Sequence, residues 1–374
     1  MAEKDFIVTP WEVVGDVDYT ELVKRFGTQE IDEALLARIK KHAPLHYMLR
    51  RKIFFSHRDL DWVLGEYEKG NKFFLYTGRG PSDDTHLGHL VPWIFTKYLQ
   101  DSFGSKLYFQ MTDDEKFLFK EKLSREETHS LAYENALDVI ALGFDSKKTM
   151  IFADTDVIDF LYPHALEVAK KVTFSTAKAV FGFTNETNIG GIFFTSIQSV
   201  PAFIESIKQK KPVPCLIPHA IDQDPHFRIT RDVAPKIGFP KPSSIHCKFL
   251  PSLKGSGKMS SSGSPDSMIY TTDSPEEVER KIMSAFTGGR DTIEEQKRLG
   301  GRPEICPIFS YYTFLFETDD EKLKEIEQQC RSGKLMCGED KARLCERVKK
   351  FLAEHQKNRE AARKQLSKFM AKKI

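Results

Sequence analysis

Short apolar segments that alternate with helical patterns constrain the fold of this 374-residue sequence more than any other feature. The clearest segments are residues 71–77 (NKFFLYT), 106–111 (KLYFQM) and 149–153 (TMIFA), and two further candidates are 214–218 (PCLIP) and 244–249. Turn-forming residues bound the first segment, as expected of a buried strand. Helical patterns at 87–99 and 124–143 fill the intervals, the second opening with a Ser-x-x-Glu capping box. Strands and helices that alternate at this spacing form βαβ units, so the sequence predicts an α/β fold with a parallel sheet.

The pattern changes after residue 263, where helix signals replace strand signals. Ser274-Pro-Glu-Glu277 supplies an N-cap, a proline at the first helical position and an acidic first turn. We therefore predict an α/β domain over 56–263 and a helical domain over 264–374. Residues 1–55 read as an N-terminal extension with one helix over 19–41.

Composition excludes several classes of protein. No run of eighteen apolar residues exists, so no membrane-spanning segment is predicted. The six cysteines form no C-x-x-C pair, which predicts reduced thiols in a cytoplasmic protein and no metal site. The net charge is only +2, but residues 339–374 carry twelve Lys or Arg against five Asp or Glu. Apolar residues at helical spacing predict a long amphipathic helix there, whose basic face is either simply solvated or neutralises nucleic-acid phosphates.

A glycine-bearing turn follows the first apolar segment, and it matches neither of the two commonest nucleotide-binding fingerprints. The sequence has no G-x-x-x-x-G-K-[ST], and Asp83 stands where a dinucleotide-binding turn needs its third glycine. The turn does lead into His86-Leu-Gly88-His89 at the start of the predicted helix. Residues three apart share a helix face, so both imidazoles could meet an anion attracted by the helix N-terminus. A structural capping histidine is the simpler alternative.

A second glycine- and serine-rich segment, Lys254-Gly-Ser-Gly-Lys258-Met-Ser-Ser-Ser-Gly263, lies far downstream. On its own it reads either as a linker between domains or as a loop that holds a polyphosphate with Lys258. Together with the histidine-bearing helix start, it matches the paired signatures of class I aminoacyl-tRNA synthetases.

Several blocks in order extend this resemblance from about residue 50 to the end of the chain. They are TGRGP at 77–81, MTDDEK at 111–116, AIDQDP at 220–225, RDVAP at 231–235, KMSSS at 258–262 and GGRDTIEE at 288–295. The sequence thereby resembles cytosolic tryptophanyl-tRNA synthetases of the eukaryotic type. It departs from the generic KMSKS in lacking the second lysine, and the helical hairpin that precedes this similarity in animal relatives is missing.

The resemblance implies a Rossmann-type catalytic domain with a dimerisation insertion, an α-helical anticodon-binding domain and a homodimer. It implies charging of tRNA(Trp) with L-tryptophan, with ATP as substrate and Mg²⁺. The catalytic residues implied are His86, His89 and Lys258. The implied ATP-binding residues are Arg79, Gly80, Pro81, Ser82, Gly88, Met259, Ser260 and Ser262.

The same resemblance places Tyr76 and Gln110 beside the indole ring of tryptophan. It also implies that Glu115, Lys116, Gln198 and Gln223 bind tryptophan, with the acid and the glutamines holding its amino and carboxylate groups. Arg290 and Asp291 are candidates for contact with tRNA.

Three other functions stay open at this point. Tyrosyl-tRNA synthetases share the fold and both signatures, although TGRGP and AIDQDP favour tryptophan. Nucleotidyltransferases also carry His-x-Gly-His, but are usually shorter and have no basic helical domain. A non-catalytic RNA-binding relative would retain the fold, and the presence of His86, His89 and Lys258 argues against it.

Overall fold

A seven-stranded sheet with strand order β3-β4-β9-β8-β5-β6-β7 forms the centre of the molecule. The structure is a computed structural model and describes residues 6–8, 13–15, 17–82, 84–255 and 264–374. Its strands are β3 (Gln29–Glu30), β4 (Phe54–Arg58), β5 (Phe74–Arg79), β6 (Leu107–Met111), β7 (Thr149–Ala153), β8 (Cys215–Ala220) and β9 (Ser243–Cys247). Strands β9, β8, β5, β6 and β7 run parallel, whereas β4 pairs antiparallel with β9 and with β3. A separate hairpin joins β1 (Ile7–Val8) to β2 (Val13–Val14). The predicted α/β fold with a mostly parallel sheet is confirmed.

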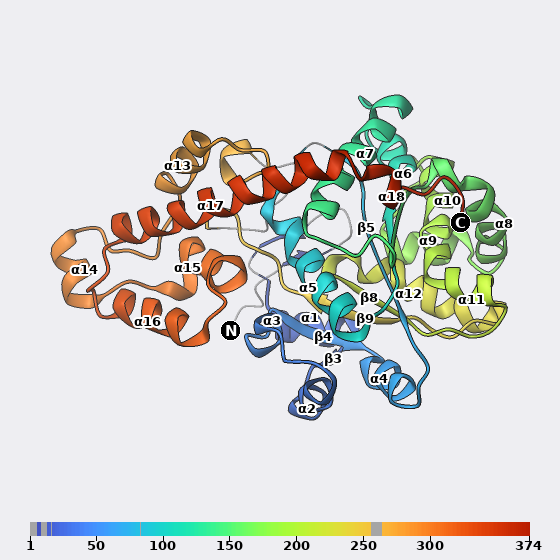
Figure 1. Ribbon diagram of the computed structural model, residues 1–374, viewed down its shortest axis with the longest axis horizontal. Coiled ribbons are helices and arrows are strands. Elements are labelled where there is room, and N and C mark those ends of the chain that lie inside the picture. Colours follow the sequence, from blue (N-terminus) through green and yellow to red (C-terminus); the bar gives the residue numbers. More distant parts are fainter. Residues whose placement is uncertain (1–5, 9–12, 16, 83, 256–263) are drawn as a thin grey trace.

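All five apolar segments expected to be strands are strands, because both faces of the sheet are covered. Along β5, Leu75 packs into the core on one face, while Phe74 and Tyr76 pack into the core on the other. A strand buried on both sides reads as an unbroken apolar run rather than an alternating one. Figure 1 shows the helices around the sheet. They are α4 (Leu60–Glu68), α5 (Leu87–Phe103), α6 (Asp113–Phe119), α7 (Arg125–Ala141), α8 (Ile158–Ala169), α9 (Phe174–Phe181), α10 (Ile189–Ile197), α11 (Ile204–Gln209) and α12 (Asp224–Val233).

The prediction of one helix over 19–41 is wrong. The structure has α1 (Tyr19–Phe26) and α2 (Glu33–His42), separated by β3, and a short α3 (Tyr47–Arg50) follows. Gly27 ends α1 in the left-handed region at φ 62°, and the Asp32 carboxylate caps α2 by accepting from the Leu35 N–H. These local stop and start signals interrupt the apolar periodicity. Strands β3 and β4 then extend the central sheet.

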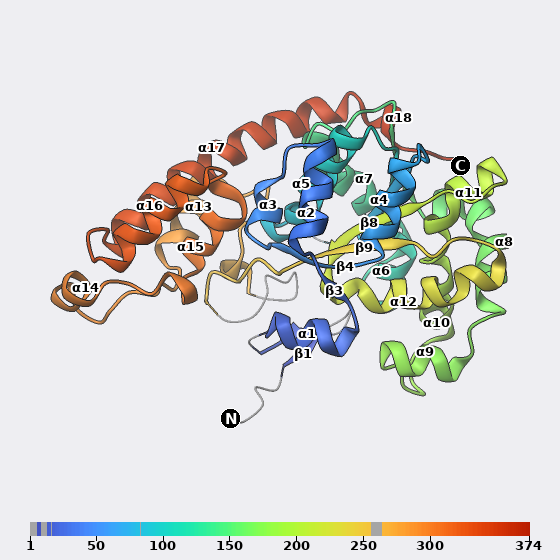
Figure 2. The same ribbon diagram turned by 90° about the horizontal axis from the view of Figure 1, so that it is seen from below.

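Beyond β9 the part of the chain that the structure describes contains helices and no further strand. These are α13 (Pro275–Met283), α14 (Ile293–Leu299), α15 (Pro307–Tyr311), α16 (Asp320–Arg331), α17 (Cys337–Arg363) and α18 (Leu366–Phe369). The long helix expected near the C-terminus is α17. Figures 1 and 2 show that it runs from the group formed by α13–α16 to α7, beside the sheet.

Many basic side chains of α17 have carboxylate partners. The ion pairs are Arg343–Glu339, Arg347–Glu317, Lys349–Glu279, Arg359–Glu134 and Arg363–Glu134. Arg359 is moreover buried against α7. Part of the positive charge of this helix therefore stabilises its own packing and is less available to phosphates than its sequence suggests.

Candidate functional site

A cavity of about 620 Å³ opens where β5 lies between β8 and β6, at the carboxyl ends of these strands. From β5 the chain continues to β6 on one side, whereas β8 and β9 lie on the other side. Such a switch in strand order leaves a crevice at the carboxyl edge of a parallel sheet, which is where open α/β proteins bind ligands. Much of the lining comes from the carboxyl ends of four strands and the residues after them, at 77–80, 112–116, 219–223 and 247–250, and from the start of α5.

His86 and His89 both line this cavity, and they also cap the helix that carries them. The backbone N–H of His86, the N-cap of α5, donates to Nδ1 of His89 at 3.3 Å. The two rings stack with centroids 3.6 Å apart. The capping and the ligand-facing interpretations are therefore compatible. Because Nδ1 of His89 accepts a hydrogen bond, the ring proton belongs on Nε2, which makes Nε2 a donor.

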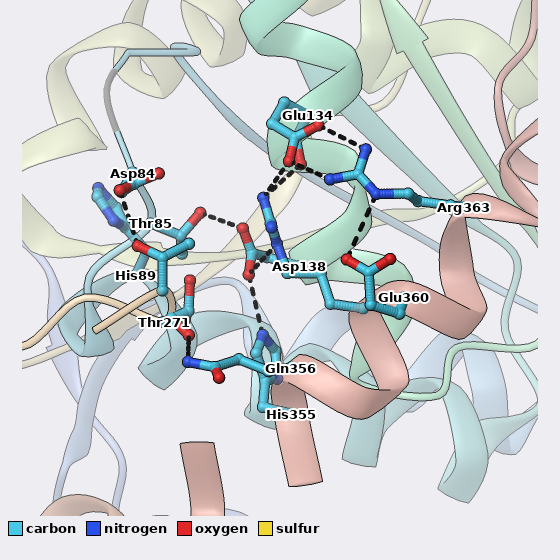
Figure 3. A network of polar contacts seen from close by, with 12 residues as sticks. Asp84, Thr85, His89, Glu134, Asp138, Thr271, His355, Gln356, Glu360 and Arg363 are labelled. Carbon is cyan, nitrogen blue, oxygen red and sulfur yellow. Dashed lines mark hydrogen bonds and ion pairs between the residues drawn. The ribbon is translucent and has the colours of Figure 1, made fainter. Parts of the chain in front are cut away.

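Arg79 holds the turn that precedes α5. Its guanidinium donates to Thr85 Oγ1 at 2.5 Å and to the backbone oxygen of Asp84 at 3.3 Å. Thr85 in turn donates to Asp138 on α7 at 2.8 Å, a contact visible in Figure 3. The guanidinium thus lines the cavity and at the same time fixes the shape of its rim.

The predicted ATP-binding residues of this turn lie mostly at the cavity. Gly80, Ser82 and Gly88 line it together with Arg79, whereas Pro81 is buried and is not part of the lining. A Cβ atom on Gly80 would lie 2.1 Å from Cε of Lys116, so glycine lets that lysine approach the turn. The predictions for Lys258, Met259, Ser260 and Ser262 fall outside the residues that the structure describes.

The predicted tryptophan-binding residues divide into two layers. Glu115, Lys116, Gln198 and Gln223 line the cavity. Tyr76 and Gln110 are only 1% and 0% exposed and lie behind its wall. The Tyr76 hydroxyl donates to Gln110 Oε1, and Nε2 of Gln198 donates to that hydroxyl at 3.4 Å. Burial raises the pKa of Tyr76 well above its ordinary value, so the hydroxyl keeps its proton.

Sequence reasoning missed several lining residues. Aromatic side chains form much of the wall: Trp93, Phe119, Phe181, Phe183, Phe227 and Phe249. His219 and His226 also line the cavity, and burial lowers the pKa of both, that of His226 to about 4, so both imidazoles are neutral near pH 7. His219 near the end of β8 and Lys248 just after β9 could have been found from their position at the ends of parallel strands. Phe181 and Phe183 carry no such local signal.

Comparison with known proteins agrees with this geometry. The family of tRNA synthetases class I (W and Y) matches residues 68–353. A Tryptophan–tRNA ligase of Pyrococcus abyssi is 52% identical, covering 98% of this chain and 94% of the relative. One from Pyrobaculum aerophilum is 50% identical, covering 98% of both chains. The crystal structure of a tryptophanyl-tRNA synthetase from Encephalitozoon cuniculi bound to tryptophan has a TM-score of 0.88 at 35% identity, over 96% of this chain and 98% of that one.

The chain belongs to the tryptophan–tRNA ligase family. The family description alone covers both tryptophan and tyrosine enzymes, and the named relatives decide for tryptophan. The protein is therefore an aminoacyl-tRNA synthetase, an enzyme that uses ATP as a substrate.

In this ligase the two candidate tRNA-binding residues lie between α13 and α14, and neither lines the cavity. Nε of Arg290 donates to the backbone oxygen of Gly300 at 2.9 Å. The Arg290 side chain thus helps to fold this loop, whereas Asp291 is exposed.

No helix in the described ranges is both long and apolar enough to cross a membrane. The same ranges contain no group of three His, Cys, Asp or Glu side chains placed to hold a metal ion.

Proposed function

We propose that the cavity at the carboxyl edge of the sheet is where L-tryptophan reacts with ATP to form tryptophanyl-adenylate and pyrophosphate. In a second step the tryptophanyl group passes to the 3′ end of tRNA(Trp). One observation carries this assignment: the cavity is lined both by the two histidines at the N-terminus of α5 and by acid and amide side chains on its wall.

The first step needs no general base, because the tryptophan carboxylate is ionised at neutral pH. The enzyme must lower the activation barrier by positioning the carboxylate against the phosphate and by stabilising the negative charge that builds on the phosphates. We assign this role to His86, His89 and the backbone N–H groups of Gly80 and Ser82, because all four residues line the cavity. We assign the same role to Lys258 from its motif. Lys258→Ala in the assay below tests that assignment.

Tryptophan recognition requires a flat apolar slot, an acceptor for the indole N–H and partners for the ammonium and carboxylate groups. The aromatic wall supplies the slot, and Glu115, Gln198 and Gln223 supply the polar partners. We assign Gln110 and Tyr76 to the indole N–H. Rejection of amino acids that leave such buried polar groups unpaired can reach about 10⁴–10⁵-fold, so an editing domain is unnecessary.

Magnesium would enter with ATP. Mg²⁺ keeps several waters and prefers phosphate oxygens with few protein ligands. Glu115 and Asp222 are carboxylates in the lining, which fits a site of this kind. We therefore do not assign Mg²⁺ a coordination site made of protein ligands alone.

The deciding experiment is ATP–pyrophosphate exchange with the purified full-length protein. Exchange that depends on tryptophan and does not occur with tyrosine is the expected result. Exchange with tyrosine, or none with either amino acid, would contradict the proposal.

We expect Asp291→Ala to weaken tRNA charging without affecting adenylate formation. A carboxylate that accepts from a base edge contributes about 1–3 kcal/mol of discrimination, so kcat/KM for charging should fall by roughly 5- to 150-fold. Exchange should stay unchanged, since Asp291 lies outside the cavity. Glu294→Ala, an exposed acid on the following helix, is the control. If Asp291→Ala left the charging of native tRNA and of anticodon-altered tRNA both at the wild-type level, Asp291 would not be part of the tRNA interface.

We propose that the protein is a homodimer that associates through α8 and its neighbours. Ile158, Tyr162 and Leu166 follow one another at helical spacing on α8, and all three are exposed. Ile189, at the start of α10, is 85% exposed. Figure 1 shows α8 and α10 at the end of the molecule opposite α14. Exposed apolar side chains gathered on two packed helices favour an isologous contact with a second copy.

Ile189→Asp is then expected to convert the dimer to a monomer, because it would bury a carboxylate in the contact. Light scattering coupled to gel filtration measures the change. Ile293→Asp, at a 64% exposed position of the helical region, should leave the mass unchanged. A monomeric wild type would contradict the proposal.

The resemblance to the eukaryotic cytosolic type remains part of this proposal, since the two curated relatives reported above are archaeal. Charging of eukaryotic in preference to archaeal tRNA(Trp), and a cytoplasmic location of the tagged protein, are the expected results.

A further inference from the structure

A buried carboxyl group, Asp154, holds the amide of Gln110 from behind the cavity wall. Gln110 lies on β6 and Asp154 directly follows β7, which pairs with β6 in parallel. Nε2 of Gln110 donates to both oxygens of Asp154, each at 2.9 Å. Both side chains are 0% exposed. Water therefore does not compete for this contact.

The contact determines which end of the Gln110 amide meets Tyr76. With its NH₂ group on the carboxyl oxygens, Gln110 presents Oε1 to the Tyr76 hydroxyl, which donates to it. A flipped amide would place Oε1 against two carboxyl oxygens and lose both hydrogen bonds. Oε1 has two lone pairs, so one remains for a further donor after Tyr76 is bound.

We propose that Asp154 is a positioning residue for tryptophan specificity, fixing the Gln110 amide so that its oxygen accepts from the indole N–H. This inference rests on the role proposed for Gln110. Without Asp154 the amide could turn its NH₂ group toward the indole, and two donors would then face each other in a buried site.

Neighbouring acids do not change the argument. Burial raises the pKa of Asp154, and repulsion from Asp114 and Asp113 adds to this effect. A protonated carboxyl has one O–H donor and retains acceptor lone pairs. In either protonation state Asp154 can accept from the amide.

The test compares tryptophan with 3-(benzothiophen-3-yl)alanine, an isostere in which sulfur replaces the indole N–H. In pyrophosphate exchange, Asp154→Leu, which has no acceptor for the Gln110 amide, is expected to raise KM for tryptophan and lower the tryptophan-to-analogue ratio of kcat/KM, each roughly tenfold. KM for ATP should stay within about twofold. Asp113→Leu is the matched control, because Asp113 is equally buried and bonds Thr155 in the same turn but does not contact Gln110. It should keep the wild-type ratio.

The double variant Gln110→Glu with Asp154→Asn reverses donor and acceptor while conserving the number of carboxyl groups. It should restore the tryptophan-to-analogue ratio, which a merely structural role would not predict. An unchanged ratio in a folded Asp154→Leu, or a ratio in the folded double variant that stays below that of the wild type, overturns the proposal. A crystal structure of the wild-type protein with bound tryptophan tests the proposal independently. An indole N–H that donates to an acceptor other than Gln110 Oε1 would overturn the proposal. Absence of tryptophan-dependent exchange in wild type would instead refute the proposed function.

Discussion

His89→Ala is expected to slow tryptophan-dependent pyrophosphate exchange by about 10²–10³-fold at saturating substrates, as loss of one transition-state donor does elsewhere. Nδ1 of His89 accepts from the His86 N–H at 3.3 Å, so the ring proton lies on Nε2, which is the donor that we assign to the phosphates. The negative charge on these phosphates increases in the transition state, so the loss should appear in kcat. KM for tryptophan should change little, because the amino acid contacts other parts of the wall.

Two companion variants separate catalysis from helix capping. His89→Asn retains an oxygen that can accept from the His86 N–H but is too short to replace Nε2. It should therefore be as slow as His89→Ala. His129→Ala removes a histidine that pairs with Asp156 at 3.1 Å away from the cavity lining, and should exchange at the wild-type rate. Near-wild-type exchange by His89→Asn would mean that His89 acts only as a cap.

The parallel part of the fold could be predicted because its information is local. Leu75 and Phe74 belong to different cores on opposite faces of β5, so the strand is apolar throughout and stands out from its flanks. The antiparallel edge could not be predicted in the same way. Phe54 pairs with Cys247, and no local pattern specifies a partner so far along the chain.

The residues of the site also differ in whether local sequence could predict them. His86 and His89 are neighbours in sequence, on one turn of helix, and their spacing alone indicated a shared face. A role for Tyr76 and Gln110 at the indole could be predicted only from the family resemblance, since a tyrosine and a glutamine in apolar strands look like ordinary core residues. His226 reaches the cavity from α12, and only tertiary packing brings it there.

Asp138→Ala is expected to destabilise the protein by about 3–5 kcal/mol, the usual cost of removing one member of a buried ion pair. Asp138 is fully buried on α7 and joins three elements, as Figure 3 shows. Its carboxylate accepts from Thr85 at 2.8 Å and contacts His355 at 2.9 Å and Arg359 at 3.1 Å. Removing it leaves the Arg359 guanidinium without one of its two acid partners and the Thr85 hydroxyl without its acceptor.

Urea unfolding at pH 7 measures this loss. Glu360→Ala removes an exposed acid that lies 3.5 Å from Arg363, and should change the free energy of unfolding by less than about 1 kcal/mol. If Asp138→Ala were as stable as Glu360→Ala, the network would contribute nothing to joining α17 to the catalytic part of the chain.

The pH dependence provides a second check on the same network. Burial by itself would raise the pKa of Asp138, but the hydrogen bonds and charges of His355, Arg359 and Thr85 outweigh it and lower the pKa. A carboxylate whose folded pKa is lowered stabilises the fold above its unfolded pKa, near 3.9, and this contribution disappears as the pH falls through the folded pKa. Asp138→Asn cannot titrate. The difference in unfolding free energy between wild type and Asp138→Asn should therefore be constant from pH 7 to about 5 and shrink below about 4. A difference that grew on acidification would mean that the carboxyl is protonated in the folded state and that its partners do not hold it as an anion.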